Sequence, residues 1–267
     1  MKPGPRGRSN TVQSMPRPVN AAPRPSTLSS KQEPPWSVEQ WVEHVPPVVA
    51  SVGLSPTPAQ LAALAGYMAL LQRWNATYNL TALRSPQDML SHHLADCLVV
   101  VEPLLAHLGL DWDQAQSVPS RFNLLDVGSG GGLPGVVLAI LCPAVAVTCV
   151  DTVGKKAAFI RQVAAELKLP NLRAEHARVE QLKGHFDVVA SRAFASLVDF
   201  TDWTRQLLRP DHGIWMAMKG KMPDDELAAL PKTVSVQRHQ ALQVPGLDAE
   251  RCLLWLIPQL EGGTQKG

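Results

Sequence analysis

Hydrophobic residues recur every three or four positions between residues 36 and 108, and this spacing predicts amphipathic helices. Each expected helix opens with a Ser or Thr followed three residues later by Gln or Asp, which is typical of a capped N-terminus. The three starts are Ser37, Thr57 and Ser85. We expect Pro46 and Pro47 to end the first helix, because proline lacks the N–H that a helix interior needs. The stretch 36–108 is therefore expected to form an N-terminal helical segment.

From Phe122 onward, short apolar runs alternate with amphipathic runs, which is the pattern of strands and helices in a parallel sheet. The expected strands span 122–127, 145–150, 172–175, 186–191, 213–218, 233–244 and 252–257. Helices are expected at 134–141, 154–168, 196–208 and 224–230. No long helix separates the last two strands, so they must run antiparallel. The expected fold is α/β, a mostly parallel sheet finished by an antiparallel hairpin over residues 121–258, with 109–120 as a surface connection.

The first 35 residues differ from the rest of the chain in charge. They hold six basic residues, one acidic residue and frequent prolines, so we expect a disordered basic tail over residues 1–35. Subtracting this tail from the totals of 25 basic and 23 acidic residues leaves a body with a net charge near −3. Binding of a polyanion by the body therefore requires a local basic patch. Residues 259–267 are expected to form a flexible C-terminus.

The cysteines and the hydropathy of the chain indicate the cellular compartment in which the protein is expected. The four cysteines form no C-x-x-C pair and have no histidine at zinc spacing, which indicates reduced thiols and no metal site. Residues 127–150 carry no charge, but their glycines and prolines prevent a continuous membrane-spanning helix. The N-terminus lacks the apolar core of a secretory signal, and its prolines disfavour an organellar transit helix. We expect a cytoplasmic protein that does not enter a membrane.

The strongest local signal is the sequence L-L-D-V-G-S-G-G-G-L-P-G at residues 124–135, between an expected strand and an expected helix. Glycines let the backbone turn sharply and approach a ligand closely. A phosphate-binding P-loop is excluded because no Gly-Lys-Ser/Thr follows. A nicotinamide dinucleotide site remains compatible, since Asp151 ends the next strand, about 20 residues on, where a ribose ligand is expected. A plain turn from strand to helix is the structural alternative.

Asp126 discriminates between the possible cofactors. It lies near the end of the first expected strand, just before the glycines. Its carboxylate would repel a pyrophosphate, whereas it would attract the amino and sulfonium groups of S-adenosylmethionine. The position of this acid therefore favours S-adenosylmethionine over a dinucleotide.

Five segments also resemble one known family. They are R-W-N-A-T-Y-N-L-T-A-L at 73–83, D-V-G-S-G-G-G-L-P-G at 126–135, A-R-V-E at 177–180, S-R-A-F-A-S-L at 191–197 and M-K-G at 218–220. In this order they closely resemble the bacterial 16S rRNA guanine-N7 methyltransferases, the glucose-inhibited division protein B family, over roughly residues 55–257. The resemblance implies a seven-stranded, Rossmann-like class I methyltransferase sheet. It also implies methyl transfer from S-adenosylmethionine to N7 of one guanine in 16S rRNA or the small ribosomal subunit.

The resemblance further implies roles for single residues. The residues expected to bind the cofactor are Gly128, Gly130, Leu133, Asp151, Val179, Glu180 and Arg192. Those expected to contact the substrate are Asn79, His93, Arg192 and Lys219. Within the first set, Asp151 is expected at the ribose, and Val179 and Glu180 at the adenine. Arg192 is expected to be exposed in a loop after the fourth strand, where the methyl group meets its acceptor.

The chemistry of guanine N7 explains why the sequence offers no obvious catalytic residue. N7 has a lone pair and no proton, so its methylation requires alignment and no general base. The candidates for a basic RNA patch, of which only some are expected to face the substrate, are Lys155, Lys156, Arg161, Arg173, Arg178, Arg192, Lys219 and Lys221. Two alternatives from other classes stay open at this point, an NAD-dependent oxidoreductase and an RNA-binding protein with a vestigial cofactor site.

Overall fold

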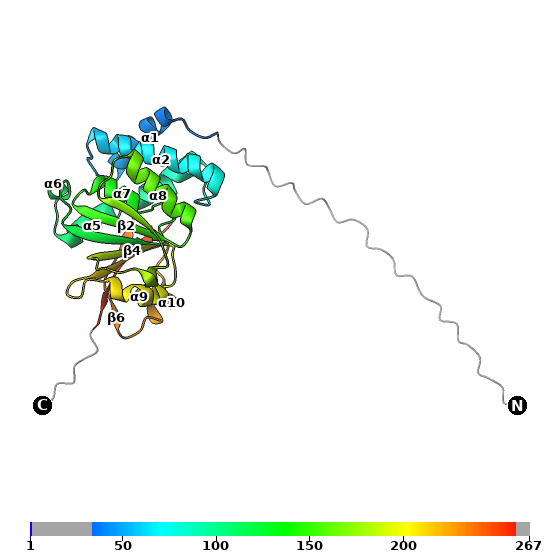
Figure 1. Ribbon diagram of the computed structural model, residues 1–267, viewed down its shortest axis with the longest axis vertical. Helices are drawn as coiled ribbons and strands as arrows, with labels where there is room; N and C mark the ends of the chain where they lie inside the picture. Colours follow the sequence, from blue (N-terminus) through cyan, green and yellow to red (C-terminus); the bar gives the residue numbers. More distant parts are fainter. Residues whose placement is uncertain (2–33, 260–267) are drawn as a thin grey trace. The chain divides into compact units, whose positions relative to one another are not determined.

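The computed structural model describes residues 34–259, together with Met1 (Figure 1). The predicted basic tail, apart from Met1, Pro34 and Pro35, lies outside the described residues. So does the predicted flexible C-terminus, apart from Gln259.

A seven-stranded sheet with strand order β3-β2-β1-β4-β5-β7-β6 forms the centre of the fold. The strands are β1 Phe122–Val127, β2 Val145–Asp151, β3 Leu172–His176, β4 Val188–Arg192, β5 Ile214–Lys219, β6 Val234–Leu242 and β7 Arg251–Pro258. The first five are parallel to one another, and β7 runs antiparallel to both β5 and β6. The predicted α/β class, the seven strands and the closing antiparallel hairpin are confirmed.

Helices cover both faces of this sheet. On one face α7 and α8 lie against the strands, and α1 and α2 form a further layer outside them, whereas α9 and α10 lie on the opposite face (Figure 1). The longer helices are α1 Val38–Ser51, α2 Pro58–Tyr78, α5 Val101–Leu108, α7 Gly135–Leu141, α8 Gly154–Glu166 and α9 Leu197–Thr204. The short ones are α3 Pro86–Met89, α4 Asp96–Leu98, α6 Trp112–Ala115 and α10 Asp224–Ala228. The predicted N-terminal helical layer is thus present.

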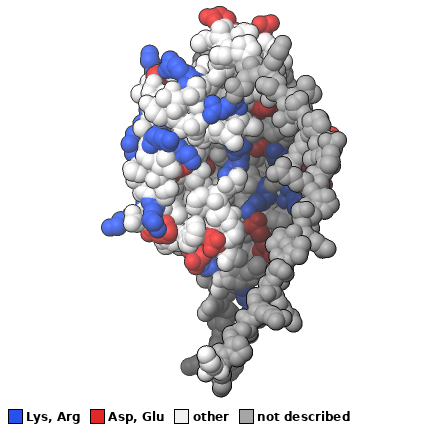
Figure 2. All heavy atoms as spheres, turned by 90° about the vertical axis from the view of Figure 1, so that its right-hand side faces the viewer, with Lys and Arg blue, Asp and Glu red and all other residues white. Residues whose placement is uncertain are grey.

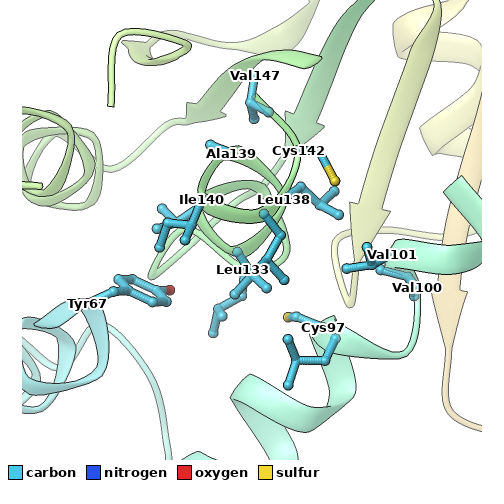
Figure 3. Packing of buried hydrophobic residues seen from close by; sticks show 14 of the residues in the cluster. Tyr67, Cys97, Val100, Val101, Leu133, Leu138, Ala139, Ile140, Cys142 and Val147 are labelled. Carbon is cyan, nitrogen blue, oxygen red and sulfur yellow. The ribbon is translucent and has the colours of Figure 1, made fainter. Parts of the chain in front are cut away.

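The sheet divides the apolar core in two because successive strand residues point to opposite faces. In β1, Leu124 joins the larger cluster beneath the helical layer, and its neighbour Leu125 joins the smaller cluster beneath α9. Figure 3 shows part of the larger cluster, where Tyr67 of α2 and Cys97 of α4 point toward residues of α7 such as Ile140. The helical layer is therefore continuous with the core of the sheet domain.

Two predictions about the part of the chain before the sheet are wrong. Helix α1 continues through Pro46 and Pro47 to Ser51, because Trp41, Val45 and Val49 bury one apolar face, and this packing outweighs the lost backbone hydrogen bonds. The stretch 109–120 is no simple surface connection either, since it contains α6 and the fully buried Ala115.

The region after Ser85 is helical as predicted, but it is not one regular helix. A π-helix, Leu90–Ala95, separates α3 from α4, and α5 follows. Among the described helices, only the run Pro86–Leu108 is long and apolar enough to meet the criteria for crossing a membrane, with a mean hydropathy of 1.3. About two thirds of its most apolar window, 67%, is buried inside the protein, and a core helix meets the same criteria.

Candidate cofactor pocket at the carboxyl ends of the central strands

A pocket of about 490 Å³ opens where β1 and β2 end. In open α/β sheets, ligands generally bind at this edge, beside the point where the strand order reverses. Here β1 is that point, because β2 and β3 extend from one side of it and β4 and β5 from the other. The lining residues are Val127, Gly128, Val150, Asp151, Thr152, Val153, Lys156, Ala177, Arg178, Val179, Glu180, Ala193, Phe194 and Trp203.

Gly128 begins the glycine loop and has a φ of +66°, a left-handed conformation that glycine adopts without strain. A side chain here would also overlap the ring of Phe194, which lies directly over the glycine. Phe194 in turn packs edge-on against Trp203, with ring centroids 6.0 Å apart. The close approach of ring and backbone at the pocket wall therefore requires glycine at 128.

Asp151 connects the glycine loop to the end of β2. Its carboxylate accepts hydrogen bonds from the backbone N–H of Gly130 at 3.0 Å and of Val153 at 2.8 Å. The ammonium of Lys156 lies 3.6 Å from the same carboxylate. Asp151 thus holds the loop in shape while its side chain borders the pocket, a structural role that its position in the sequence did not reveal.

Asp126 lies beneath the glycine loop and does not line the pocket. The residue is fully buried, and its Oδ2 accepts a hydrogen bond from the N–H of Gly135, the first residue of α7, at 2.9 Å. Oδ1 has no partner. Burial raises the pKa of this carboxyl from 3.8 to about 7, although the Gly135 N–H and Arg192 act in the opposite direction. The predicted attraction between Asp126 and a cofactor cation is therefore replaced by a hydrogen bond that supports the loop.

Tyr67 of α2 holds the loop from the other side. Its hydroxyl donates a 2.7 Å hydrogen bond to the carbonyl of Gly131, although the two residues are 64 positions apart. Burial is the main reason why the pKa of this hydroxyl is raised, so the donor proton is retained. Sequence reasoning assigned α2 an apolar face but did not identify this tyrosine, because nothing local links it to the loop.

The predicted cofactor residues separate into two groups. Gly128, Asp151, Val179 and Glu180 all line the pocket. Leu133 lies instead in the large apolar cluster, 3% exposed, close to residues of α7 (Figure 3). The structure therefore brings four of the seven predicted residues together at the pocket. Of the other three, Leu133 lies in the core, Gly130 donates its N–H to Asp151, and Arg192 pairs with Asp96.

Arg192 is not an exposed loop residue, and that prediction is wrong. It is the last residue of β4, and only 20% of its side chain is exposed. Its Nη1 donates to the carbonyl of His92 and to Oδ2 of Asp96, each at 3.0 Å. The strand extends one residue further than predicted. The guanidinium of Arg192 therefore points into the buried contact between β4 and the helical segment.

The predicted substrate residues lie in different environments. His93 is buried in the π-helix, where its Nδ1 lies 3.2 Å from the carbonyl of His92. Burial, followed by the charge of Arg192, lowers the pKa of His93 to about 4, so the ring is neutral at pH 7. Asn79 is exposed at the left-handed end of α2, and its side chain accepts a hydrogen bond from Arg84.

Lys219, at the end of β5, contacts protein groups. Its ammonium donates to Oε2 of Glu226 at 2.8 Å and to the carbonyl of Ala195 at 3.2 Å. Glu226 also accepts from the N–H of Leu197, the first residue of α9, at 2.7 Å. The loop between β4 and α9 is therefore held by a lysine that the sequence suggested only as a substrate contact.

The basic residues considered for an RNA patch are dispersed. Lys156 and Arg178 line the pocket, whereas Arg161 donates from Nε to the carbonyl of Ala174 at 3.0 Å. Lys155, Arg173 and Lys221 are exposed. On the face in Figure 2, Lys and Arg side chains form several groups with acidic side chains between them. Within residues 34–259, no group of three His, Cys, Asp or Glu side chains is placed to hold a metal ion.

Sequence similarity to known proteins assigns this chain to a family. A family model described as rRNA small subunit methyltransferase G matches residues 60–254. The Ribosomal RNA small subunit methyltransferase G of Acidovorax sp. (strain JS42) is 59% identical over 208 residues, which cover 78% of this chain and 91% of that protein. The protein of the same name from Polaromonas sp. (strain JS666 / ATCC BAA-500) is 57% identical over 203 residues, 76% and 87% of the two chains.

Among solved structures, TrmN from Thermus thermophilus is similar with a TM-score of 0.45 and 18% identity, over 64% of this chain and 53% of that chain. The sequence relatives share far more identity and span most of both chains. Because the family model also matches well over half of the chain, this protein belongs to the rRNA small subunit methyltransferase G family.

Proposed function

We propose that this protein transfers a methyl group from S-adenosylmethionine to N7 of a guanine in 16S rRNA. The observation that supports the proposal best is the pocket at the ends of β1 and β2, bordered by the glycine loop and Asp151. Family membership supports the same conclusion, since the relatives are named methyltransferases of the small-subunit rRNA. Neither observation favours an oxidoreductase.

The residues around the pocket fit S-adenosylmethionine. Val127, Val150 and Val179 provide apolar walls for a flat adenine ring. Asp151 provides carboxylate oxygens that can accept hydrogen bonds from ribose hydroxyls. The bare backbone at Gly128 leaves room that a side chain would fill. These three features match an apolar ring, a sugar and a close backbone contact.

The mechanism requires the protein to bind and align rather than to move a proton. When bound, S-adenosylmethionine would supply the methyl group. The lone pair of N7 would form the new N–C bond as the S–C bond breaks in line with it, with S-adenosylhomocysteine as the leaving group. N7 carries no proton, so no side chain has to act as a general base. The contribution of this chain is to hold the loop Ala193–Ser196 and the glycine loop in a fixed arrangement, through Lys219, Asp151 and Tyr67.

The substrate base must be accessible at its major-groove edge. That edge is closed to side chains in an A-form RNA duplex, so the target guanine is expected to be unpaired or turned out of its stack. The partner is 16S rRNA or the small ribosomal subunit, and the place of action is the cytoplasm.

Calorimetry tests the cofactor. We expect S-adenosylhomocysteine to bind the protein and NAD to show no binding at the same concentration. Tight binding of NAD without binding of S-adenosylhomocysteine would contradict the proposal and favour a dehydrogenase.

Mapping of 7-methylguanine tests the substrate. Ribosomal RNA from cells with and without the protein is compared, and purified protein is then incubated with naked 16S rRNA and with small subunits. We expect one guanine to lose its methyl group in the deletion strain and to regain it in one of the two reactions. Unchanged methylation throughout 16S rRNA would refute the assignment.

A further inference from the structure

Asp96 is a nearly buried acid, 4% exposed, that contacts two arginines from distant parts of the chain. Its Oδ2 accepts from Nη1 of Arg192 at 3.0 Å, and its Oδ1 accepts from Nε of Arg251 at 2.7 Å. The partners are 96 and 155 positions away in the sequence. Charge-assisted hydrogen bonds of this kind have well-defined geometry, so the carboxylate fixes both guanidinium groups.

The π-helix before Asp96 supplies a second contact to the same arginine. In a regular α-helix, the N–H of Asp96 would bond to the carbonyl of His92, four residues earlier. Here this N–H bonds to the carbonyls of Ser91, His93 and Leu94. The carbonyl of His92 accepts from Nη1 of Arg192 instead. Local departures from α-helical geometry of this kind occur often at functional sites.

Both arginines lie at the edge of the sheet where the pocket opens. Arg192 ends β4, and the next two residues, Ala193 and Phe194, line the pocket. Arg251 begins β7, which pairs with β5 and brings its first residues beside Lys219. Asp96 therefore connects the helical segment to the strand end that leads into the pocket wall.

We propose that Asp96 is a positioning residue for methyl transfer, which holds Arg192 so that the segment Ala193–Phe194 keeps the place required by the transfer reaction. It acts through Arg192 and does not touch cofactor or substrate. The proposal rests on the proposed methyl transfer for its kinetic consequence. Its structural consequence is that the loop after β4 is held in one conformation, and this does not depend on that activity.

Asp96→Asn tests the proposal, because asparagine preserves the shape and removes the charge. We expect the single-turnover rate at saturating cofactor and RNA to fall at least tenfold. Amide hydrogen exchange at Leu197, whose N–H donates to Glu226 at the end of the same loop, is expected to rise at least tenfold. Asp88→Asn is the matched control, since Asp88 is an exposed acid in the neighbouring helix α3. The control is expected to leave both quantities unchanged.

A double-mutant comparison separates positioning from general stabilisation. If Asp96 acts through Arg192, then Asp96→Asn has no further effect on rate or exchange in an Arg192→Ala background. A purely structural role for Asp96 would produce the same fold-change in both backgrounds, and that result would overturn the proposal.

The exchange measurement keeps the test independent of the substrate assignment. Unchanged exchange at Leu197 of Asp96→Asn would overturn the proposal whether or not the wild type methylates rRNA. Inactivity of the wild type on rRNA, with exchange raised as expected, would contradict the proposed function alone.

Discussion

At Gly128 the lack of a side chain serves both the backbone and the neighbouring aromatic ring. Replacement by valine, Gly128→Val, is expected to lower the affinity for S-adenosylmethionine at least tenfold, because the new side chain would displace Phe194 at the pocket wall. The left-handed φ adds about 1–2 kcal/mol of backbone strain. Calorimetry with the folded variant provides the measurement.

The matched control is Gly109→Val. Gly109 has a φ of +64°, nearly that of Gly128, but no atom within 4 Å of the position that a Cβ would take. We expect a loss of stability from backbone strain alone, with normal cofactor affinity. If Gly128→Val bound S-adenosylmethionine as tightly as Gly109→Val does, the result would show that the glycine loop does not contact the cofactor.

Asp126 makes stability depend on pH in an unusual direction. Because burial raises its pKa to about 7 in the folded protein, the folded state holds a proton that the unfolded chain releases between about pH 4 and 7. The free energy of unfolding therefore receives a contribution that is present below pH 4 and is lost as the pH rises toward 7. Each unit of pKa difference corresponds to about 1.4 kcal/mol.

The variant Asp126→Asn removes this titration and keeps an oxygen that can accept from the N–H of Gly135. We expect it to gain stability relative to the wild type between pH 5 and pH 8, as measured by urea denaturation. Asp248→Asn, in an exposed loop, is the control and is expected to follow the wild-type pH profile. Parallel profiles for the wild type and Asp126→Asn would contradict the raised pKa.

At the scale of the element, α2 supports the glycine loop through one hydroxyl group. Tyr67→Phe removes the hydrogen bond to the carbonyl of Gly131 and is expected to cost about 1–3 kcal/mol of unfolding free energy. Cofactor affinity should fall too, because the loop loses its support from the helical layer. The chain has only one other tyrosine, Tyr78 in the same helix, and it is 42% exposed. Tyr78→Phe keeps its ring contact with Trp74 and should change neither quantity.

The limits of the elements were largely predictable from local sequence. The capping boxes at Ser37 and Thr57 form as expected, and the Ser85 side chain accepts from the N–H of Asp88. The continuation of α1 through Pro46 and Pro47 was not predictable, because it depends on burial of Trp41 against other parts of the chain. Strand β4 ends one residue later than the local pattern predicts, and Arg192 is therefore paired with Asp96 and not exposed in a loop.

At the scale of the whole molecule, the N-terminal tail is expected to add affinity for RNA without selecting the base. Its six basic residues outnumber its one acidic residue, so the tail has a net positive charge that attracts phosphates of any RNA sequence. Deleting residues 1–35 should weaken binding of all RNA sequences to a similar extent. The slope of log affinity against log salt should become shallower, by about 0.7 for each phosphate of single-stranded RNA that the tail neutralises.

Methylation by the shortened protein at two salt concentrations provides the measurement. Transfer to the same guanine with a salt-dependent loss of affinity is the expected outcome. Transfer to other bases would show that the tail selects the target, contrary to this interpretation.

Most helices and strands, the parallel sheet, the closing hairpin and the position of the glycine loop could be predicted from the sequence, because periodicity, caps and glycine runs act over short distances along the chain. The glycine run and the strand end indicated Gly128 and Asp151, and the resemblance to a known family implied Val179 and Glu180. The side chains that hold the loop and the strand ends in place could be identified only from the folded chain. The hydrogen bonds from Tyr67 to Gly131 and from Arg251 to Asp96 join residues 64 and 155 positions apart, and no local pattern specifies such pairs.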